Sequence, residues 1–424
     1  MYKTEASTGL FLICILGLFC LSTSIFKQQD QALAQQYIQT IKYRNLVIDL
    51  GAGVKTKAQL TYPATGKGPF PAVLLIHGSG AQDMNETLTK NAKPFWQIAQ
   101  YLSERGFAVL RYDKRGVGAT SYTISNSNVY GNATANDFIH DAEKALNVLI
   151  RQPEVDSKRI SILGHSEGTI YAPRIAIDNS TKVKNVILMA ALAQNPTRVV
   201  EYATDVSLPL EYAMQVLDKN HTGQISIQQI ANAPVLLKFL PLPHSLLRAN
   251  NTKTITTTIA KVFGTTGYIS IGKQLKPMLV KTYENTTSFN PSNACVLNPS
   301  NVGLCPILWR SLANMIPNLS IIGNVSKSTG ILIFHGENDS QVPVQEAFLL
   351  QQRLTDVNHP DHTLITYPNL GHAFYPSSEW LTSIGPIQPY VLADLYVWLE
   401  AHSGLSKSNI TPTTTASVTG QIQR

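Results

Sequence analysis

The sequence predicts an α/β protein with a doubly wound, mostly parallel sheet, helices on both faces, and an inserted, mainly helical cap. Three observations lead to this fold. Short apolar runs alternate with amphipathic helical segments up to about residue 195, the same alternation resumes near residue 330, and a G-x-S-x-G pentapeptide directly follows one of the runs. A composition with 44% hydrophobic and 14% charged residues agrees with a large globular core and excludes a disordered chain.

The order of the elements follows from the apolar periodicity. Residues 45–50 and 55–62 alternate as in a β-hairpin, and the later short apolar runs predict strands. We expect strands at residues 71–76, 107–112, 159–163, 183–190, 330–334 and 362–367, and helices at residues 93–104, 135–151, 167–177, 345–354 and 390–402. Strands that are separated by helices pair in parallel, so their C-terminal ends meet at one edge of the sheet.

The chain divides into a discontinuous core and a cap. We expect the core over residues 35–195 and 328–402, because the strand–helix alternation covers both stretches. The block between them, residues 196–327, is too long for a loop and carries apolar helical patterns, which predicts the cap. Residues 403–424 are rich in Ser and Thr without periodicity, so we expect a disordered tail there.

The N-terminal 34 residues have the features of an export signal. Lys3 precedes an apolar stretch, and Ala32-Leu33-Ala34 is typical of a cleavage site, so residues 1–34 are expected to form a signal peptide. The alternative is an N-terminal membrane anchor formed by residues 9–26. Either interpretation predicts a secreted or extracytoplasmic protein.

Cysteine use agrees with an oxidising compartment. Cys14 and Cys20 fall in the N-terminal segment, which leaves Cys295 and Cys305 as the pair in the rest of the chain. We expect these two to close a short loop as a disulfide, with two unrelated free thiols as the alternative. Recurring N-x-S/T sequons favour a glycosylated surface or secreted protein, or else reflect a composition rich in Asn, Ser and Thr.

The G-x-S-x-G pentapeptide predicts a nucleophile. Gly164-His165-Ser166-Glu167-Gly168 lies between a predicted strand and a predicted helix, which forces a sharp turn at Ser166. The residues that pack closest to such a turn must be glycine, because a side chain would collide with the neighbouring helix or strand. The turn lifts the serine hydroxyl out of the sheet and points the first N–H groups of the helix at the same space.

Two further residues complete a catalytic triad with Ser166. A serine hydroxyl needs an adjacent base, and the base needs a third group that fixes its tautomer and stabilises its cation. The base candidate is His372, which follows the final predicted strand, and the acid candidate is Asp339, which follows the strand at residues 330–334. The order Ser, Asp, His at successive strand ends predicts that the three side chains meet at one edge of the sheet.

An acyl-transfer site also needs N–H donors for the oxyanion that forms on the substrate. The backbone N–H of Glu167 is one expected donor. The other should come from the loop His77-Gly78-Ser79-Gly80, where glycines let the backbone approach closely, and either Gly78 or Ser79 is expected to donate.

Together these motifs resemble the α/β-hydrolase superfamily. The H-G-S-G loop, the run Y-D-K-R-G-V-G at residues 112–118 and the G-H-S-E-G pentapeptide are similar to its serine-aminopeptidase-like and dienelactone-hydrolase-like branches. The resemblance implies a Ser166/Asp339/His372 triad and hydrolysis of an ester or amide. The sequence departs from the commonest pattern of these branches at Thr120 and Thr169, which leaves the triad itself unchanged.

The leading functional interpretation is an exported serine hydrolase that cleaves carboxylic esters through an acyl-enzyme on Ser166. An acyl-peptide hydrolase or aminopeptidase is the alternative, and a non-catalytic surface binding protein is a remote one. The Glu167 side chain either interacts with the helix dipole or binds a substrate amine, as an aminopeptidase would require. We expect a small-molecule or peptide acyl substrate, no nucleic-acid partner, and no cofactor or metal, because the triad supplies base, nucleophile and electrostatics by itself.

The predicted cap carries most of the net charge of +7, with eleven Lys and Arg against five Asp and Glu. One hypothesis is that it attracts anionic substrates or polyanionic envelope material, and the alternative is a solvated basic surface without a partner. Residues 218–229 follow the twelve-residue EF-hand pattern, with Asp218 at position one and Gly223 at position six. Because Gln229 replaces the bidentate Glu at position twelve, we expect poor calcium affinity and a loop kept for its fold.

Overall fold

The computed structural model describes residues 40–118, 124–237, 239–243, 252–285, 305–376 and 385–404. The predicted signal peptide or anchor, all but the first residues of the predicted tail, and Cys295 lie outside these ranges. The Cys295–Cys305 disulfide therefore stays a prediction, and Cys305 itself is buried just before α13 (Pro306–Ala313). Within the described ranges, no helix combines the length and the apolar character that crossing a membrane requires.

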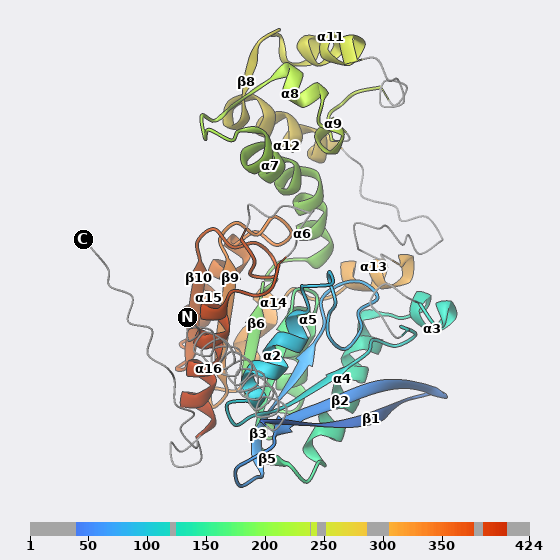
Figure 1. The fold of residues 1–424 in the computed structure, drawn as a ribbon, viewed down its shortest axis with the longest axis vertical. Helices are drawn as coiled ribbons and strands as arrows, with labels where there is room; N and C mark the ends of the chain where they lie inside the picture. Colours follow the sequence, from blue (N-terminus) through green and yellow to red (C-terminus); the bar gives the residue numbers. More distant parts are fainter. Residues whose placement is uncertain are drawn as a thin grey trace, which may run out of the picture.

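An eight-stranded sheet forms the centre of the molecule, with the strand order β1-β2-β4-β3-β5-β6-β9-β10 (Figure 1). Its strands are β1 (Ile41–Gly51), β2 (Val54–Pro63), β3 (Phe70–Ile76), β4 (Ala108–Tyr112), β5 (Val155–His165), β6 (Val183–Met189), β9 (Gly330–Gly336) and β10 (His362–Tyr367). The predicted hairpin is the antiparallel pair β1–β2, and β2 is also antiparallel to β4. All pairs from β4 to β10 are parallel, so the predicted mostly parallel sheet is confirmed.

Helices cover both faces of this sheet. One face is covered by α2 (Pro94–Ser103) and α16 (Pro389–Ser403), and the other by α4 (Ala135–Ile150), α5 (Gly168–Asp178) and α15 (Gln345–Asp356). Along β3, Leu74 and Ile76 belong to the apolar cluster of α4 and α5, whereas Val73 and Leu75 belong to the cluster of α2 and α16. Because both faces are buried, the strands read as continuous apolar runs rather than as alternating ones.

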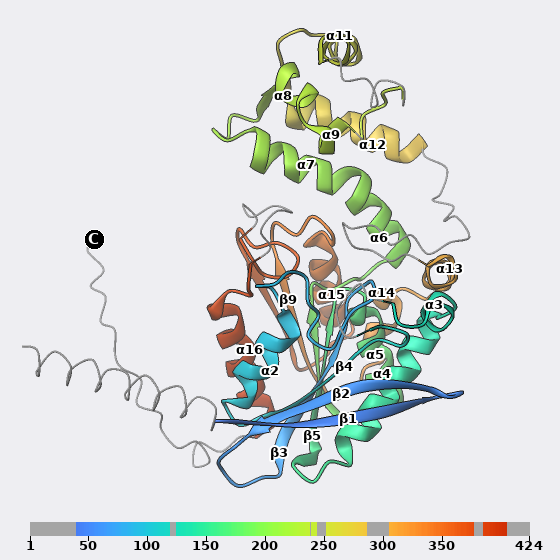
Figure 2. The same ribbon diagram turned by 45° about the vertical axis from the view of Figure 1, so that its right-hand side comes forward.

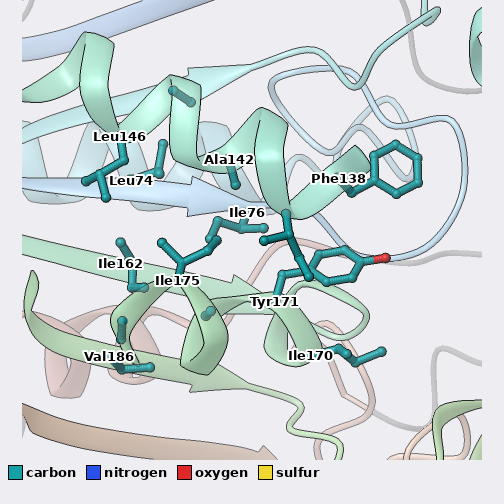
Figure 3. Close-up of a cluster of buried hydrophobic side chains, with 14 of the residues drawn as sticks. Leu74, Ile76, Phe138, Ala142, Leu146, Ile162, Ile170, Tyr171, Ile175 and Val186 are labelled. Atoms are coloured by element: carbon teal, nitrogen blue, oxygen red, sulfur yellow. The ribbon is translucent and has the colours of Figure 1, made fainter. Parts of the chain in front are cut away.

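Figure 3 shows how the first of these clusters is built. Side chains from three parallel strands, among them Leu74, Ile162 and Val186, face Leu146 of α4 and Ile175 of α5. Every one of these residues is fully buried, so the cluster holds the two helices against the middle strands of the sheet.

Local sequence signals set the ends of several elements. Thr134 and Asp137 form a capping box in which the Thr134 side chain accepts the Asp137 N–H and the Asp137 side chain accepts the Thr134 N–H, which starts α4. β5 begins at Val155, earlier than the predicted start at residue 159. The polar residues 156–158 interrupt the apolar run, but Val155 is buried and pairs with Phe70 of β3.

The segment between β6 and β9 is inserted at the C-terminal edge of the sheet and is mainly helical. In its described residues the α-helices are α6 (Pro196–Tyr202), α7 (Leu208–Tyr212), α8 (Ile227–Ala231), α9 (Pro234–Leu237), α11 (Thr252–Phe263), α12 (Lys276–Asn285), α13 and α14 (Asn318–Ile321). π-helical turns continue some of these helices, at Ala203–Ser207, Ala213–Leu217 and Ile271–Leu275, and a two-stranded sheet joins β7 (Gln224–Ser226) to β8 (Tyr268–Ser270). Figure 2 shows α7 to α12 gathered beyond the ends of the strands.

The two parts of this segment pack into different apolar clusters. Elements from α7 to α12 share an apolar cluster of their own, which includes Ile225, Ile259 and Leu275. In contrast, Leu308 and Leu312 of α13 belong to the main cluster of the sheet. The predicted cap, residues 196–327, therefore contains both an independent helical body and a C-terminal part that packs with the core. We call residues 196–285 the insert below.

Candidate active site

The predicted nucleophile, Ser166, lies on a sharp turn between β5 and α5. Its φ of 52° is in the left-handed region, which a non-glycine residue adopts only where the surrounding structure enforces it. A Cβ at Gly164 would collide with the carbonyl group of Gly168, and a Cβ at Gly168 would collide with the carbonyl oxygen of Ile76. The predicted need for glycine on both sides of this turn is confirmed.

Asp339 and His372 lie on the loops that follow β9 and β10. His372 Nδ1 donates to Asp339 Oδ2 at 2.8 Å, and Asp339 Oδ1 accepts the N–H groups of Gln341 at 2.8 Å and Val342 at 2.9 Å. The two loops are also joined through their backbones, because Asn338 donates to the Leu370 carbonyl oxygen at 3.0 Å. This arrangement fixes the carboxylate and keeps the His372 proton on Nδ1, which leaves Nε2 as a base.

The carboxylate of Asp339 stays ionised although it is buried. Burial alone would raise the pKa of this carboxyl, but the charge of His372 and hydrogen bonds from His335 and His372 outweigh it and hold the pKa well below its usual range. His335 is fixed in turn, because its Nε2 donates to the Val342 carbonyl oxygen at 2.8 Å and its Nδ1 accepts the Ala191 N–H at 3.2 Å. The acid of the predicted triad is therefore held by side chains and backbone together.

The structure brings the turn of Ser166 beside the loop of His372. The imidazole rings of His165 and His372 lie with their centroids 5.0 Å apart, and both residues are buried. All three predicted triad residues thus occupy one edge of the sheet. Among the side chains that the structure describes, no group of three or more His, Cys, Asp or Glu is arranged to hold a metal ion.

The contacts of the H-G-S-G loop within the described residues show which of its two predicted oxyanion donors, Gly78 or Ser79, has a free N–H group. The Gly78 N–H donates to Glu86 Oε1 at 2.6 Å, so this N–H is already engaged and the prediction for Gly78 needs correction. The Gly78 carbonyl oxygen accepts from Lys114 Nζ at 2.6 Å. Because C=O and N–H point in opposite directions across a trans peptide, this bond turns the Ser79 N–H away from Lys114. Ser79 therefore remains the donor that this loop offers.

The Glu167 side chain does not lie free in the site. Its Oε1 accepts from Lys114 Nζ at 2.9 Å, and both side chains are almost fully buried. The ion pair neutralises the carboxylate, while its Oε2 is buried without a hydrogen-bond partner among the described residues, which favours a structural role over binding of a substrate amine. The backbone N–H of Glu167, at the start of α5, has no acceptor among the described residues, as an oxyanion donor requires.

Sequence reasoning missed three ionisable residues near this site. Glu86 lies in a loop without periodicity, where a single acidic residue carries no signal. His165 occupies the variable position of the G-x-S-x-G motif and was not assigned a role. Glu211 lies on α7 of the insert and is 8% exposed, and its Oε1 has no hydrogen-bond partner among the residues that the structure describes. Burial, with a contribution from the charge of Asp339, raises the pKa of Glu211 to about 7.

Comparison with known proteins gives the family of this chain. The family model for the alpha/beta hydrolase fold matches residues 71–378 of the sequence, which span β3 to β10 and the insert. The chain belongs to the alpha/beta hydrolase fold family. The match confirms the resemblance to the α/β-hydrolase superfamily that the motifs indicated, and it agrees with the fold that the strand order shows.

Individual relatives match over part of their length. Esterase EstD of Thermotoga maritima is 36% identical over 171 residues, which are 38% of this chain and 38% of that protein. Esterase FrsA of Yersinia pestis is 25% identical over 175 residues, which are 40% of this chain and 38% of that protein. The chain thus spans well under two thirds of the length of these relatives. A proline iminopeptidase structure from Mycobacterium smegmatis superposes over 85% of this chain and 99% of its own, with 14% identity and a TM-score of 0.49.

Proposed function

We propose that this chain is a serine hydrolase that cleaves carboxylic esters through an acyl-enzyme on Ser166. The observation that carries the proposal is the His372–Asp339 hydrogen bond of 2.8 Å, formed beside a serine that is held on a strained strand–helix turn. The names of the matched esterases support an ester rather than an amide as the substrate, although the matches cover part of each chain.

In the proposed reaction, His372 Nε2 takes the proton of the Ser166 hydroxyl while the serine oxygen attacks the ester carbonyl carbon. The oxyanion accepts hydrogen bonds from the N–H groups of Glu167 and Ser79. His372 then gives the proton to the leaving alcohol as the carbon–oxygen bond breaks. Water attacks the acyl-enzyme in the same way and releases the acid, which returns Ser166 to its starting state.

Asp339 keeps His372 in the tautomer that this sequence of steps needs. When His372 becomes an imidazolium, the buried carboxylate at 2.8 Å stabilises it. The insert stands beyond the C-terminal edge of the sheet, where parallel strands place their sites, so we propose that it caps the active site and selects the acyl group (Figure 2).

A peptidase acting on substrates with a free amine is the alternative. It would need an acidic group that binds the amine, and Glu167 is already bonded to Lys114. This observation favours the esterase over the aminopeptidase that uses Glu167 for recognition.

The test is turnover of p-nitrophenyl acyl esters of increasing chain length, beside aminoacyl p-nitroanilides. We expect ester hydrolysis that Ser166→Ala abolishes, and a chain-length optimum that reports the size of the acyl pocket. Ser328→Ala, an exposed serine after the insert, is the matched control and should retain full activity. Ester activity that persists in Ser166→Ala would refute the proposal, and activity on the anilides alone would favour the peptidase.

We also propose that the protein is exported, through a signal peptide or an anchor in residues 1–34, and that its basic insert attracts anionic material. Six exposed lysines of the insert support the second proposal: Lys219, Lys253, Lys261, Lys273, Lys276 and Lys281. Salt screens such attraction. Retention on cell-wall material and activity should therefore fall as the ionic strength rises, and insensitivity of both to salt would exclude the attraction.

A further inference from the structure

A buried carboxylate, Glu86, connects the oxyanion loop to the nucleophile turn. Glu86 is fully buried and has a φ of 52°, so the backbone is held in the left-handed region to place this side chain. Its Oε1 accepts the Gly78 N–H at 2.6 Å, and its Oε2 accepts from His165 Nδ1 at 2.9 Å. One carboxylate therefore bonds both to the loop that carries Ser79 and to the residue that precedes Ser166.

His165 also contacts the loop of His372. Its Nε2 lies 3.3 Å from the His372 carbonyl oxygen, while its Nδ1 faces Glu86. Both partners are acceptors, so the imidazole satisfies both only when each nitrogen holds a proton. Burial alone would lower the pKa of His165, but the charge of Glu86 outweighs it and raises the pKa. Nearby His77 differs, because burial and the charge of Lys114 lower its pKa to about 4.

We propose that Glu86 and His165 form a positioning pair, which holds the loops of Ser79, Ser166 and His372 in one fixed arrangement for acyl transfer. The proposal rests on the function proposed above. Neither side chain takes part in the chemistry: Glu86 acts through the Gly78 peptide and His165, and His165 acts through the backbone of His372. The three loops follow β3, β5 and β10, which are not all neighbours in the sheet, so the sheet alone does not join them.

The expected size of the effect follows from the oxyanion donor. Losing or misplacing one such donor lowers kcat by on the order of 100-fold, since these bonds strengthen as charge develops on the substrate oxygen. Ground-state binding of the ester depends much less on these loops. The pair should therefore affect kcat strongly and KM weakly.

Substitution of Glu86 by Met and by Gln separates positioning from folding. Glu86→Met keeps the length of the side chain but cannot accept from Gly78 or His165. Glu86→Gln can keep all three bonds: its oxygen accepts from Gly78, its amide donates to His165 Nδ1, and a neutral His165 still donates to His372. The control, Glu346→Met, removes another buried carboxylate, which accepts the N–H groups of Ala193 and Gln194 at 2.8 Å each and, among the described contacts, bonds directly to none of the three loops.

Turnover is measured per active serine, counted by titration with a fluorophosphonate that labels Ser166. We expect kcat per labelled serine to fall about 100-fold in Glu86→Met, with KM within about threefold, and to recover to within about tenfold of the wild type in Glu86→Gln. Glu346→Met should keep wild-type kcat per labelled serine even if less protein folds. In a double-mutant cycle, His165→Gln and Glu86→Met should be non-additive, because they break the same connection.

The outcomes separate this inference from the proposed function. If the wild type is active and Glu86→Met matches it per labelled serine, the positioning pair is refuted and the function stands. If Glu86→Met does not fold, the test is made with His165→Gln. A wild-type kcat per labelled serine in His165→Gln would also refute the positioning pair. A wild type that neither labels nor hydrolyses esters would refute the proposed function, and this inference with it.

A second inference concerns the insert, where the hexapeptide T-G-x-I-S-I occurs twice, at residues 222–227 and 266–271. The two copies form β7 and β8, which pair antiparallel with Ile225 opposite Ile269. The hydrogen bonds beyond the strands are reciprocal: Ile227 donates to the Gly267 carbonyl oxygen and Ile271 to that of Gly223, both at 2.9 Å. The repeat therefore has an approximate two-fold symmetry in three dimensions.

Helices flank both copies, as in a pair of EF-hands. The serine of each copy caps the helix that follows, because Ser226 accepts the Gln229 N–H at 3.1 Å and Ser270 accepts the Lys273 N–H at 3.2 Å. In EF-hand numbering, Val262 occupies position one of the second loop and Lys273 occupies position twelve. The second loop therefore lacks a carboxylate at both of these ligand positions. The first loop keeps Asp218 but has Gln229 at position twelve.

We infer that the insert is a duplicated helix–loop–helix pair, and that hydrogen bonds keep its first loop closed without calcium. Gln229 joins the two sides of the first loop: its amide nitrogen donates to the Leu217 carbonyl oxygen and its oxygen accepts the Ser226 N–H, both at 2.8 Å. The Asp218 carboxylate accepts the N–H groups of Thr222 at 2.9 Å and Gly223 at 2.6 Å. These bonds take the place of metal coordination.

Thermal unfolding in millimolar calcium and in chelator tests this inference. We expect the same Tm and the same ester turnover for the wild type in both conditions, and a Tm that calcium raises in Gln229→Glu, which restores the bidentate ligand. A wild-type Tm that rises with calcium would overturn the metal-free closure. A Gln229→Glu variant that folds but ignores calcium would overturn the EF-hand geometry of the loop.

Discussion

Replacing Glu211 by Gln should change how the stability of the protein depends on pH. Glu211 is 8% exposed, and one of its carboxylate oxygens has no hydrogen-bond partner within the described part of the chain. Its pKa is raised from 4.5 to about 7, mainly by burial and further by the charge of Asp339. Gln has the same shape but no ionisable proton, so the substitution removes this titration and little else.

The sign and size of the effect follow from proton linkage. Between pH 4.5 and about 7 the folded protein keeps the Glu211 proton while the unfolded chain has released it. The folded state therefore binds more protons than the unfolded state, and stability falls as pH rises through this window. A shift of this size corresponds to about 3 kcal/mol, because one pKa unit is worth about 1.4 kcal/mol.

The assay is urea unfolding followed by circular dichroism at pH 4 and at pH 8. We expect the wild type to lose about 3 kcal/mol more than Glu211→Gln between these pH values, with equal m-values at each pH. Other titrating groups are common to both proteins and cancel in the difference. Glu284→Gln, which removes an exposed carboxyl from the same insert, is the control and should follow the wild type. Parallel pH dependences of the wild type and Glu211→Gln would refute the reasoning.

Two further predictions concern the turn of Ser166 and the ion pair beside it. Gly168→Ala should destabilise the protein by about 3 kcal/mol and abolish ester turnover, because the new Cβ collides with the Ile76 carbonyl oxygen. In the control variant Gly371→Ala, the new Cβ would be 3.7 Å from its nearest neighbour, so both stability and turnover should stay close to those of the wild type. Lys114→Met should cost about 3–5 kcal/mol in urea unfolding, because it leaves the buried Glu167 carboxylate without its partner. The double variant Lys114→Met/Glu167→Gln should recover most of that loss, and equal losses in both variants would contradict a role for the unpaired charge.

Much of the fold could be predicted because the relevant signals are local. Apolar runs such as 71–76 and 183–190 correspond to β3 and β6 nearly residue for residue. The apolar run predicts a start of β5 that is too late, because the polar residues 156–158 interrupt the run although Val155 pairs with β3. The repeat of T-G-x-I-S-I is present in the sequence, but only the copy with Asp218 carries a residue typical of a calcium loop, so the motif by itself does not indicate that the two copies pair.

By itself, the sequence determined the parallel sheet, the turn at Ser166 and the strand ends that carry Asp339 and His372. These features depend on residue order and on backbone geometry, which a short motif records. Only the tertiary structure decided the partners of buried polar groups: Gly78 bonds to Glu86, Glu167 to Lys114, and His165 to both Glu86 and the His372 backbone. Such partners come from different strand ends that meet at one edge of the sheet. A buried charge or N–H bonds to whichever group packing brings near, and that choice leaves no periodic trace in the chain.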